Sequence, residues 1–423
     1  MGVGAPIIDP CQGWRPMSDS QRVSTSPSGA ILITSLALMA IGLVMVASTT
    51  VSLDRSLFGP DFLRTPFARQ LVFVLMGVVL LAVTGRVARP CLASAELRRR
   101  VPVILFVIAV GLLMVALVPS LAPSHRGVQR WLRWAPGGIE IGFQPSDVAK
   151  LALVGWLAWF FTERGGDPRA LRASFVPAAG AIGLCVLLVG KEDFGTSALL
   201  AVVGAAMLLI AGCRFRHLAV LSAVGACGFA GLLLAAPYRI ARLVAFWNLS
   251  ADPSGAAYQP RQSLMTIASG GWLGTGLGSG LQKYGYLPEC HTDFIFAALC
   301  EEMGLLGGCM VIALFGVLIW LGAQAMLSAV TRFERLLAFG VTATIGLQAA
   351  MNIAVVTVLA PTTGISLPLI SAGGSGLITF CVAIGLLVAI ESRGSCAAVS
   401  ARTLGPTTHF VVGSPQAQEA AVW

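Results

Sequence analysis

The sequence predicts an all-α protein that crosses a membrane many times, and two observations lead to this fold class. Of the 423 residues, 56% are hydrophobic and only 11% are charged. A soluble globular domain carries about 25% charged residues, so this composition is typical of a polytopic membrane protein. The apolar residues are also gathered in runs with the length of membrane-spanning helices. We therefore expect ten transmembrane helices, with one large extracytoplasmic loop between the seventh and the eighth.

The ten spans are predicted from these apolar runs, and together they define the organisation of the chain. They are expected at residues 30–50, 68–84, 101–119, 148–161, 174–189, 194–211, 218–236, 294–322, 336–359 and 369–390. The eighth run is long enough to tilt or to project from the membrane. The predicted transmembrane domain covers residues 29–391, between cytoplasmic tails at 1–28 and 392–423.

The distribution of Lys and Arg predicts the orientation, because short cytoplasmic loops of membrane proteins carry an excess of these residues. With the N-terminus inside, sixteen Lys and Arg lie in the inner segments and seven in the short outer segments. Both termini are therefore expected to be cytoplasmic, and the loop over residues 237–292 to be extracytoplasmic. The first 27 residues show no cleavage site, so the first span is expected to remain as an anchor.

Several kinds of site are disfavoured by the composition. The ten cysteines form no CxxC pair and lie mostly in apolar runs, and the four histidines are scattered. We therefore predict no metal cluster and no disulfide framework. The net charge of +9 comes from basic residues spread over short loops, which does not indicate a nucleic-acid partner.

The extracytoplasmic loop contains an unusual glycine-rich segment. Residues 262–280 read QSLMTIASGGWLGTGLGSG, which is apolar as well as rich in glycine. Such a segment suits a re-entrant or interfacial element that approaches another backbone closely. It is not a dinucleotide-binding fingerprint, because the chain offers no βαβ unit around it.

The same loop ends in QKYGYLPECHTDFIF, which opens the eighth span and contains Asp293. Pro288 biases the preceding residue away from helical geometry, and Thr292 or Asp293 is expected to cap the helix that follows. A carboxylate at the mouth of a membrane helix is costly unless it faces water, a partner or a substrate. The residues alone leave open whether Asp293 is an ordinary N-cap or a functional carboxylate.

Other polar groups gather at the outer ends of the predicted spans. Lys150 follows Asp147 at i, i+3, so the two side chains can pair, and Asp193 is a candidate helix cap or second counter-ion. Clustered cations suit a phosphate or pyrophosphate headgroup, although a rim of mixed sign also suits a transporter. The predicted rim of an outward-facing cavity comprises Arg69, Arg130, Asp147, Lys150, Asp193, Arg239, Arg242, Lys283 and Asp293.

The carboxylates that follow Asp293 do not predict a glycosidase. On an ideal helix Glu301 would lie about 12 Å along the axis from Asp293, and Glu302 would point to the opposite side. Glycosidases hold their two carboxylates roughly 5–9.5 Å apart. One carboxylate acting as general base would still suffice for sugar transfer from a phosphate leaving group, which needs cations rather than a proton.

Six blocks between residues 30 and 390 carry a family resemblance. They read RGVQRWLRW, FQPSDVAKL, KEDFGTSALL, PYRIARLVAFWN, YQPRQSLMTIASGGWLGTGLGSGLQKYGYLPECHTDFIFAALCEEMGLLG and NIAVVTVLAPTTGISLPLISAGGSGL. On these blocks the chain resembles the SEDS family of bacterial cell-wall polymerases (shape, elongation, division and sporulation proteins). The resemblance implies ten transmembrane helices and a peptidoglycan glycosyltransferase that polymerises lipid II. It also implies a class B penicillin-binding transpeptidase, with one membrane anchor, as partner.

The resemblance also places individual residues. Asp293 falls on the family's proposed catalytic aspartate, and the other members of the central cavity fall on Arg69, Arg130, Asp147, Lys150 and Asp193. Three positions depart from the family pattern: Asp147 stands where a glutamate is usual, Cys290 where alanine is common, and Ala372 where a tyrosine would follow Ser371. No cofactor is implied with certainty, and a divalent cation (Mg²⁺ or Mn²⁺) is left open.

Within the family, the block around Asp293, the FWN motif and the polar N-terminal extension resemble the division branch, FtsW, more than the elongation branch, RodA. This implies the bacterial cytoplasmic (inner) membrane at the division septum, with other divisome proteins as partners. An elongation polymerase, a lipid II flippase and a scaffold that only recruits the transpeptidase are the alternatives. Small residues that allow close helix approach predict the partner's docking site near the eighth and ninth spans, at Gly304, Gly307, Gly308 and Gly316.

Overall fold

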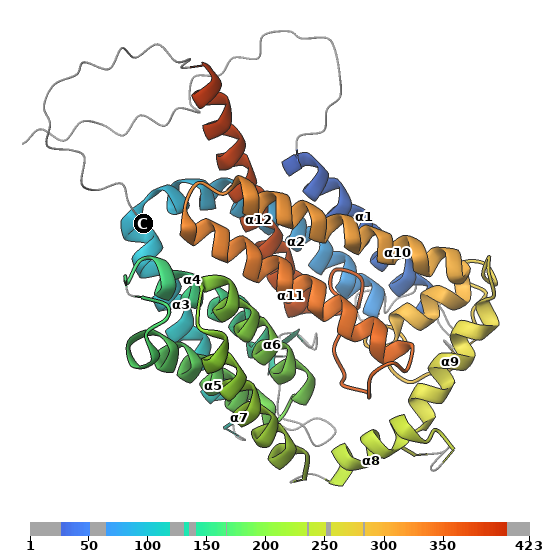
Figure 1. Ribbon diagram of the computed structural model, residues 1–423. Helices are drawn as coiled ribbons and strands as arrows, with labels where there is room; N and C mark the ends of the chain where they lie inside the picture. The colour runs from blue at the N-terminus through green and yellow to red at the C-terminus, as the bar shows by residue number, and fades with distance from the viewer. Residues whose placement is uncertain are drawn as a thin grey trace, which may run out of the picture.

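The computed structural model describes residues 27–50, 65–118, 131–134, 141–165, 167–234, 237–250, 255–281 and 284–403. Helices make up nearly all of this structure and form one bundle (Figure 1). They are α1 (Pro27–Thr50), α2 (Pro66–Ala93), α3 (Ala95–Ala116), α4 (Pro145–Thr162), α5 (Val176–Gly190), α6 (Phe194–Ala211), α7 (Phe215–Leu234), α8 (Pro237–Trp247), α9 (Tyr258–Gly270), α10 (Ile295–Ser328), α11 (Arg332–Val356) and α12 (Gly374–Thr403). A π-helical turn, η3 (Leu171–Phe175), leads into α5.

Each of the ten predicted spans overlaps a helix of this bundle. Among the described residues, eight helices are long and apolar enough to cross a membrane, which is the character of a polytopic membrane protein. The other two are α4 and α7. Helix α4 carries Asp147 and Lys150 within 18 residues, and the apolar part of α7 is only Phe215–Gly231.

The boundary of the last span differs from the prediction. Residues 357–373, between α11 and α12, are not helical, and α12 begins at Gly374 rather than near Leu369. Leu369 has a φ of 65°, in the left-handed region. Proline and paired glycines disfavour helix, which explains why the helix starts only after Pro368 and Gly373. At the other end α12 continues to Thr403, so the start of the predicted C-terminal tail is helical.

The predicted capping of the eighth span is wrong. The N-cap of α10 is Phe294, which makes no side-chain capping bond. The chain instead enters α10 through a turn at Glu289, whose φ is 58°. The carbonyl group of Glu289 accepts the N–H groups of Thr292 and Phe294 at 3.1 and 3.3 Å. The turn thus uses the main chain where side-chain capping was expected.

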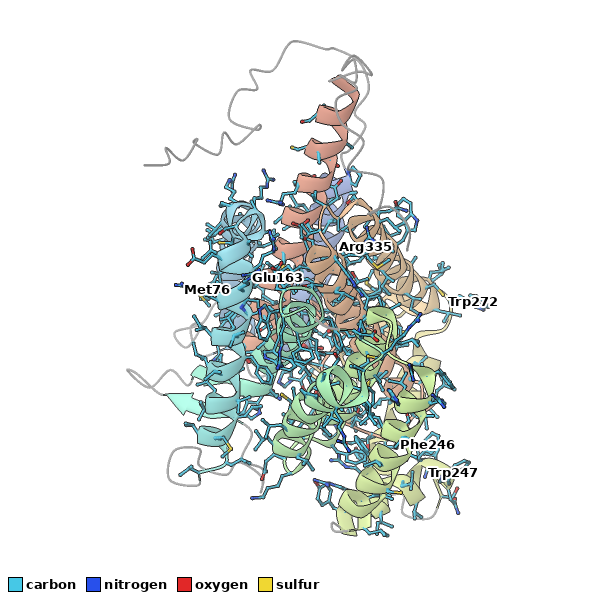
Figure 2. All side chains as sticks on the ribbon, turned by 60° about the vertical axis from the view of Figure 1, so that its left-hand side comes forward. Met76, Glu163, Phe246, Trp247, Trp272 and Arg335 are labelled. Carbon is cyan, nitrogen blue, oxygen red and sulfur yellow. The ribbon has the colours of Figure 1, made fainter. Side chains whose placement is uncertain are left out.

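The connection between α7 and α10 contains two helices that were not predicted, α8 and α9. They lie at the end of the bundle opposite the projecting end of α12 (Figure 1). Trp247, at the end of α8, and Trp272, just after α9, project away from the bundle (Figure 2), with 79% and 71% of their surface exposed. The short strands β1 (Leu132–Trp134) and β2 (Ile141–Phe143) pair antiparallel between α3 and α4.

The arginine-rich connections meet at one end of the bundle. Arg98, at the start of α3, donates to Glu163, at the end of α4, at 2.8 Å. Arg393 of α12 lies 3.3 Å from Glu334 of α11, and Arg332 donates to a carbonyl group at the end of α6. The N-terminal end of α1 and the C-terminal end of α12 lie on the same side (Figure 1).

Helix α10 is interrupted at Gly304, where φ is 70° and ψ is −176°. The glycine-rich segment after α9 fills the interruption. The N–H groups of Thr275 and Gly276 donate to the carbonyl groups of residues 301 and 302 at 2.9 and 3.0 Å, and the N–H of Leu305 donates to Gly271 at 2.9 Å. A Cβ atom on Gly304 would lie 2.3 Å from a carbonyl oxygen of this segment. The predicted close approach of two backbones is confirmed.

The side chains of Glu301 and Glu302 brace the same segment, and both are 3% exposed. The Glu301 carboxylate accepts the N–H of Leu281 at 2.9 Å, and the Glu302 carboxylate accepts the N–H of Gly278 at 3.0 Å. Ser48 of α1 donates to Glu302 Oε2 at 2.7 Å. The two carboxylates therefore hold one loop.

The glycines predicted to dock a partner helix have different roles. A Cβ on Gly307 or Gly308 would meet side chains of α10 itself, and Gly304 receives the glycine-rich segment. Only Gly316 faces open space, with no atom within 4 Å of its Cβ position. Close packing within the chain therefore accounts for three of the four.

The interruption of α10 should tolerate no side chain at Gly304. We expect Gly304→Ala to destabilise the protein by about 1–3 kcal/mol or more, because this backbone conformation is almost exclusive to glycine. Thermal unfolding in detergent measures the effect. Gly316→Ala, in the same helix but in open space, is the control, and an equal loss of stability in both variants would contradict the assignment.

Candidate active site

The chain before α10 places Asp293 beside the connection between α11 and α12. Asp293 is partly buried, and its carbonyl group accepts the side-chain N–H of Asn352 at 2.8 Å. Ser371 donates to the carbonyl group of Thr292 at 2.7 Å, and the N–H of Ala372 donates to that of His291 at 2.9 Å. The main chain around Asp293 is therefore fixed to the α11–α12 connection.

Cys290 lies three residues before Asp293 and is 8% exposed. Burial raises the pKa of its thiol to about 11, and the nearby carboxylates of Glu289, Glu301 and Glu302 add to this effect. The reactive form of cysteine is the thiolate. Cys290 is therefore protonated near neutral pH.

Asp147 and Lys150 form the predicted pair, 2.9 Å apart, inside the bundle. Lys150 also donates to the side-chain amide oxygen of Gln348 of α11 at 2.9 Å, and Ser375 of α12 donates to Asp147 at 2.8 Å. The Lys150 ammonium group lies 5.3 Å from the centre of the Phe380 ring. The side chains of the pair are 10% and 6% exposed, so Lys150 joins three helices rather than lying on an exposed rim.

Asp193 caps α6. Its carboxylate accepts the N–H of Thr196 at 2.9 Å and the Thr196 hydroxyl at 2.9 Å, and it lies 3.3 Å from the side-chain nitrogen of Gln144. The prediction of a helix cap is confirmed. Nearby, Arg239 of α8 donates to the carbonyl groups of Gly190 and Lys191 at 3.1 and 2.8 Å, which ties α8 to the turn before α6.

The remaining predicted cations differ in their surroundings. Arg242 is exposed on α8 and makes a long contact, 3.4 Å, with the carbonyl group of Thr362. Arg69 of α2 is half-buried, and its Nε has no hydrogen-bond partner among the described residues. Arg130 and Lys283 lie outside the residues that the structure describes.

Asp193 and Lys150 line different hollows. One lies between α3, α4 and the turn after α5, and Ser146 and Asp193 line it. Another lies beside Lys150 and Phe380. No group of three or more His, Cys, Asp and Glu side chains in the described part of the chain could hold a metal ion, so a divalent cation stays a prediction.

The α11–α12 connection joins the two parts of the site. Gln348 donates to the carbonyl group of Ser366 at 3.0 Å, Asn352 donates to that of Ile365 at 2.7 Å, and Gln70 of α2 donates to that of Ser371 at 3.3 Å. The sequence analysis missed these amide side chains. Gln348 and Asn352 are four residues apart in an apolar helix, which is the signal of a functional polar stripe inside a membrane span.

Comparison with known proteins places this architecture in a family. The family model for FtsW, RodA and SpoVE, described as cell cycle proteins, matches residues 29–395. The chain belongs to this family. It is 37% identical to stage V sporulation protein E of Bacillus subtilis, over 87% of this chain and 97% of the relative. It is 40% identical to a probable peptidoglycan glycosyltransferase FtsW of Alkalilimnicola ehrlichii, over 88% and 91%.

Solved structures of the family share the fold. A chain from the structure titled "Structural coordination of polymerization and crosslinking by a peptidoglycan synthase complex" matches with a TM-score of 0.68 at 23% identity, covering 86% of this chain and 97% of that one. The rod shape determining protein RodA of Thermus thermophilus matches with a TM-score of 0.60 at 24% identity, covering 86% and 96%. The similarity to these structures covers most of the chain.

Lys150 should contribute mainly to folding. We expect Lys150→Met to destabilise the protein by about 3–5 kcal/mol, because it leaves the buried Asp147 carboxylate without its cation. Thermal or denaturant unfolding in detergent measures the loss. Arg242→Ala, which removes an exposed cation, should change stability by less than about 0.5 kcal/mol. If Lys150→Met were as stable as the parent protein, the role of Lys150 in folding would be wrong, and Lys150 would again be a candidate to bind the substrate.

Proposed function

We propose that this protein is a peptidoglycan glycosyltransferase that polymerises lipid II, most directly for septal wall synthesis during cell division. The FtsW-named relatives are called probable peptidoglycan glycosyltransferases, and they match most of the chain. The observation that carries the proposal is the placement of Asp293. It is a partly buried carboxylate, on main chain that is fixed by hydrogen bonds from α11 and the α11–α12 connection.

In the proposed reaction a sugar hydroxyl of one lipid II molecule attacks the anomeric carbon of the growing strand. Asp293 takes the hydroxyl proton as the new C–O bond forms. The bond between the anomeric carbon and the pyrophosphate oxygen breaks, and undecaprenyl pyrophosphate leaves with the bonding electron pair. Such a leaving group needs positive charge rather than a proton, since its own charge increases in the transition state.

We propose that the pyrophosphate is bound by predicted rim cations that are not already paired with a carboxylate or bound to two carbonyl groups of the bundle. Arg69 keeps an unpartnered Nε among the described residues, and Arg242 is exposed. Lys150 is neutralised by Asp147, and Arg239 donates to two carbonyl groups. We assign the substrate contact first to Arg69 and Arg242, and we retain Arg130 and Lys283 as predictions. A divalent cation that accompanies the pyrophosphate remains part of the proposal.

The proposed placement in the membrane has all ten bundle helices crossing the bilayer, with both termini in the cytoplasm. The clustering of arginine-rich connections at one end of the bundle supports this orientation, because such residues favour the cytoplasmic side. Asp293 then lies toward the outer face of the cytoplasmic membrane. The division septum and the other divisome proteins follow from the resemblance to the division branch.

A lipid II flippase is the second candidate, and the buried Asp147–Lys150 pair is the observation that favours it. Ionisable residues inside membrane spans mark transport pathways as well as catalytic sites. Transport, however, makes no demand on a general base at Asp293. The two candidates therefore differ in what a single carboxylate substitution does.

The proposed partner is a class B penicillin-binding transpeptidase that docks by its membrane anchor against α10. Gly316 leaves open space on this helix, and Val317 and Trp320 beside it are 43% and 60% exposed. A small residue among exposed apolar ones allows a second helix to approach closely. Leu314, on the same helix, packs partly into the core and is less suited to this contact.

Asp293→Asn tests the enzyme proposal. We expect a folded variant that binds its transpeptidase but polymerises lipid II about 10²–10⁴-fold more slowly, because the amide keeps the size of the side chain and loses its basicity. Glycan synthesis by the purified chain, alone and with the transpeptidase, is the measurement. Glu96→Gln, an exposed carboxylate at the opposite end, is the control. Polymerisation at the parental rate would exclude Asp293 as the base.

Photocrosslinking tests the docking surface. A crosslinker at Val317 should capture the transpeptidase in cells, since this side chain lies beside the open position at Gly316. A crosslinker at Val107 of α3, which is 64% exposed, is the matched control and should capture none. Equal capture at both positions, or no capture at Val317, would show that the transpeptidase does not dock on this face of α10.

A further inference from the structure

Three successive carbonyl groups before α10, those of residues 291–293, are each bound by a different donor. The donors are the main-chain N–H of Ala372, the hydroxyl of Ser371 and the side-chain amide of Asn352, at 2.9, 2.7 and 2.8 Å. All three come from α11 and the connection that follows it. The main chain that carries Asp293 is therefore held from one side at every residue.

Asn352 acts in this arrangement only as a donor. It is 1% exposed, and its nitrogen donates to the carbonyl groups of both Asp293 and Ile365, at 2.8 and 2.7 Å. Because both neighbours are acceptors, they fix the orientation of the amide. Its oxygen has no hydrogen-bond partner in the described part of the chain. The buried amide of Asn352 donates to main-chain carbonyl groups in two segments and thereby joins residues 293 and 365, which are far apart in sequence.

Ser371 is anchored in the same way from the other side. Its hydroxyl donates to Thr292 and accepts the N–H of Leu367 at 2.8 Å. Its carbonyl group accepts the side-chain amide of Gln70 from α2 at 3.3 Å. Ser371 is 4% exposed, so these bonds are shielded from water. The contact to residues 291–293 thus extends to both α2 and α11.

We propose that Asn352 and Ser371 are positioning residues for Asp293, acting through its main chain without touching the substrate. The inference rests on the proposed function, in which Asp293 is the general base. A base must lie within hydrogen-bond reach of the proton that it takes. With its main chain fixed, Asp293 reaches the proton by side-chain rotation alone. A misplacement of about 1 Å can lower a rate about 10²-fold.

Asn352→Ala tests the proposal directly. In the full-length chain assembled with its transpeptidase, we expect kcat for lipid II polymerisation to fall about 10–100-fold, with KM and lipid II binding unchanged. The split between kcat and KM distinguishes positioning from loss of a substrate contact. Thr357→Val is the matched control, because the Thr357 hydroxyl donates only to carbonyl groups of α11. It should keep the parental kcat.

Ser371→Ala is the second variant. It tests the positioning of Asp293 if Asn352→Ala does not accumulate in folded form. It should lower kcat in the same manner. When Asn352→Ala is added to Asp293→Asn, the residual rate should not fall further, because a positioning residue has no effect once its base is gone. Parental kcat in both single variants, an equal loss in Thr357→Val, or a further loss in the Asp293→Asn background would overturn the proposal.

The outcomes also separate this inference from the proposed function. An inactive Asp293→Asn with fully active Asn352→Ala and Ser371→Ala would overturn only the positioning roles. An Asp293→Asn variant that polymerises at the parental rate would overturn the general-base assignment and the positioning roles together.

Discussion

The structure depends on one constraint: where a helix stops inside an apolar bundle, its main-chain groups need new partners. An unsatisfied N–H or C=O group in a bilayer costs several kcal/mol. The chain stops being helical before α10, at Gly304 and before α12. Each stop is compensated by groups from elsewhere, namely Asn352 and Ser371 at the first, the glycine-rich segment at the second and Gln348 at the third. The residues of the proposed active site lie at the first of these places.

Buried charge obeys a related rule. A lone ammonium group inside the bundle would be strongly disfavoured, and Lys150 is accordingly bound by a carboxylate and an amide oxygen at 2.9 Å each. Both members of the pair lie on α4, and Gln348 and Ser375 join them to α11 and α12. A polar network of this kind rigidifies a core when its members are satisfied.

Much of this architecture could be predicted from the sequence, because membrane spans depend on local composition. The ten apolar runs can be read from local composition. The Asp147–Lys150 pair and the cap at Asp193 follow from short separations along the sequence. The contacts of Asn352 with residues 293 and 365 could not be predicted, since they join segments that are distant in sequence. The interruption of α10 at Gly304 could not be predicted for a similar reason, since it depends on a separate loop.

The pairing of the glycine-rich segment with α10 has a consequence for the biogenesis of the protein. Residues 271–281 are synthesised before the residues 301–306 that bind their N–H and C=O groups. Until α10 has been made, these groups can be satisfied only by water. The segment can therefore reach its final structure only after α10 has been made. Folding of the two segments is in this sense a single event.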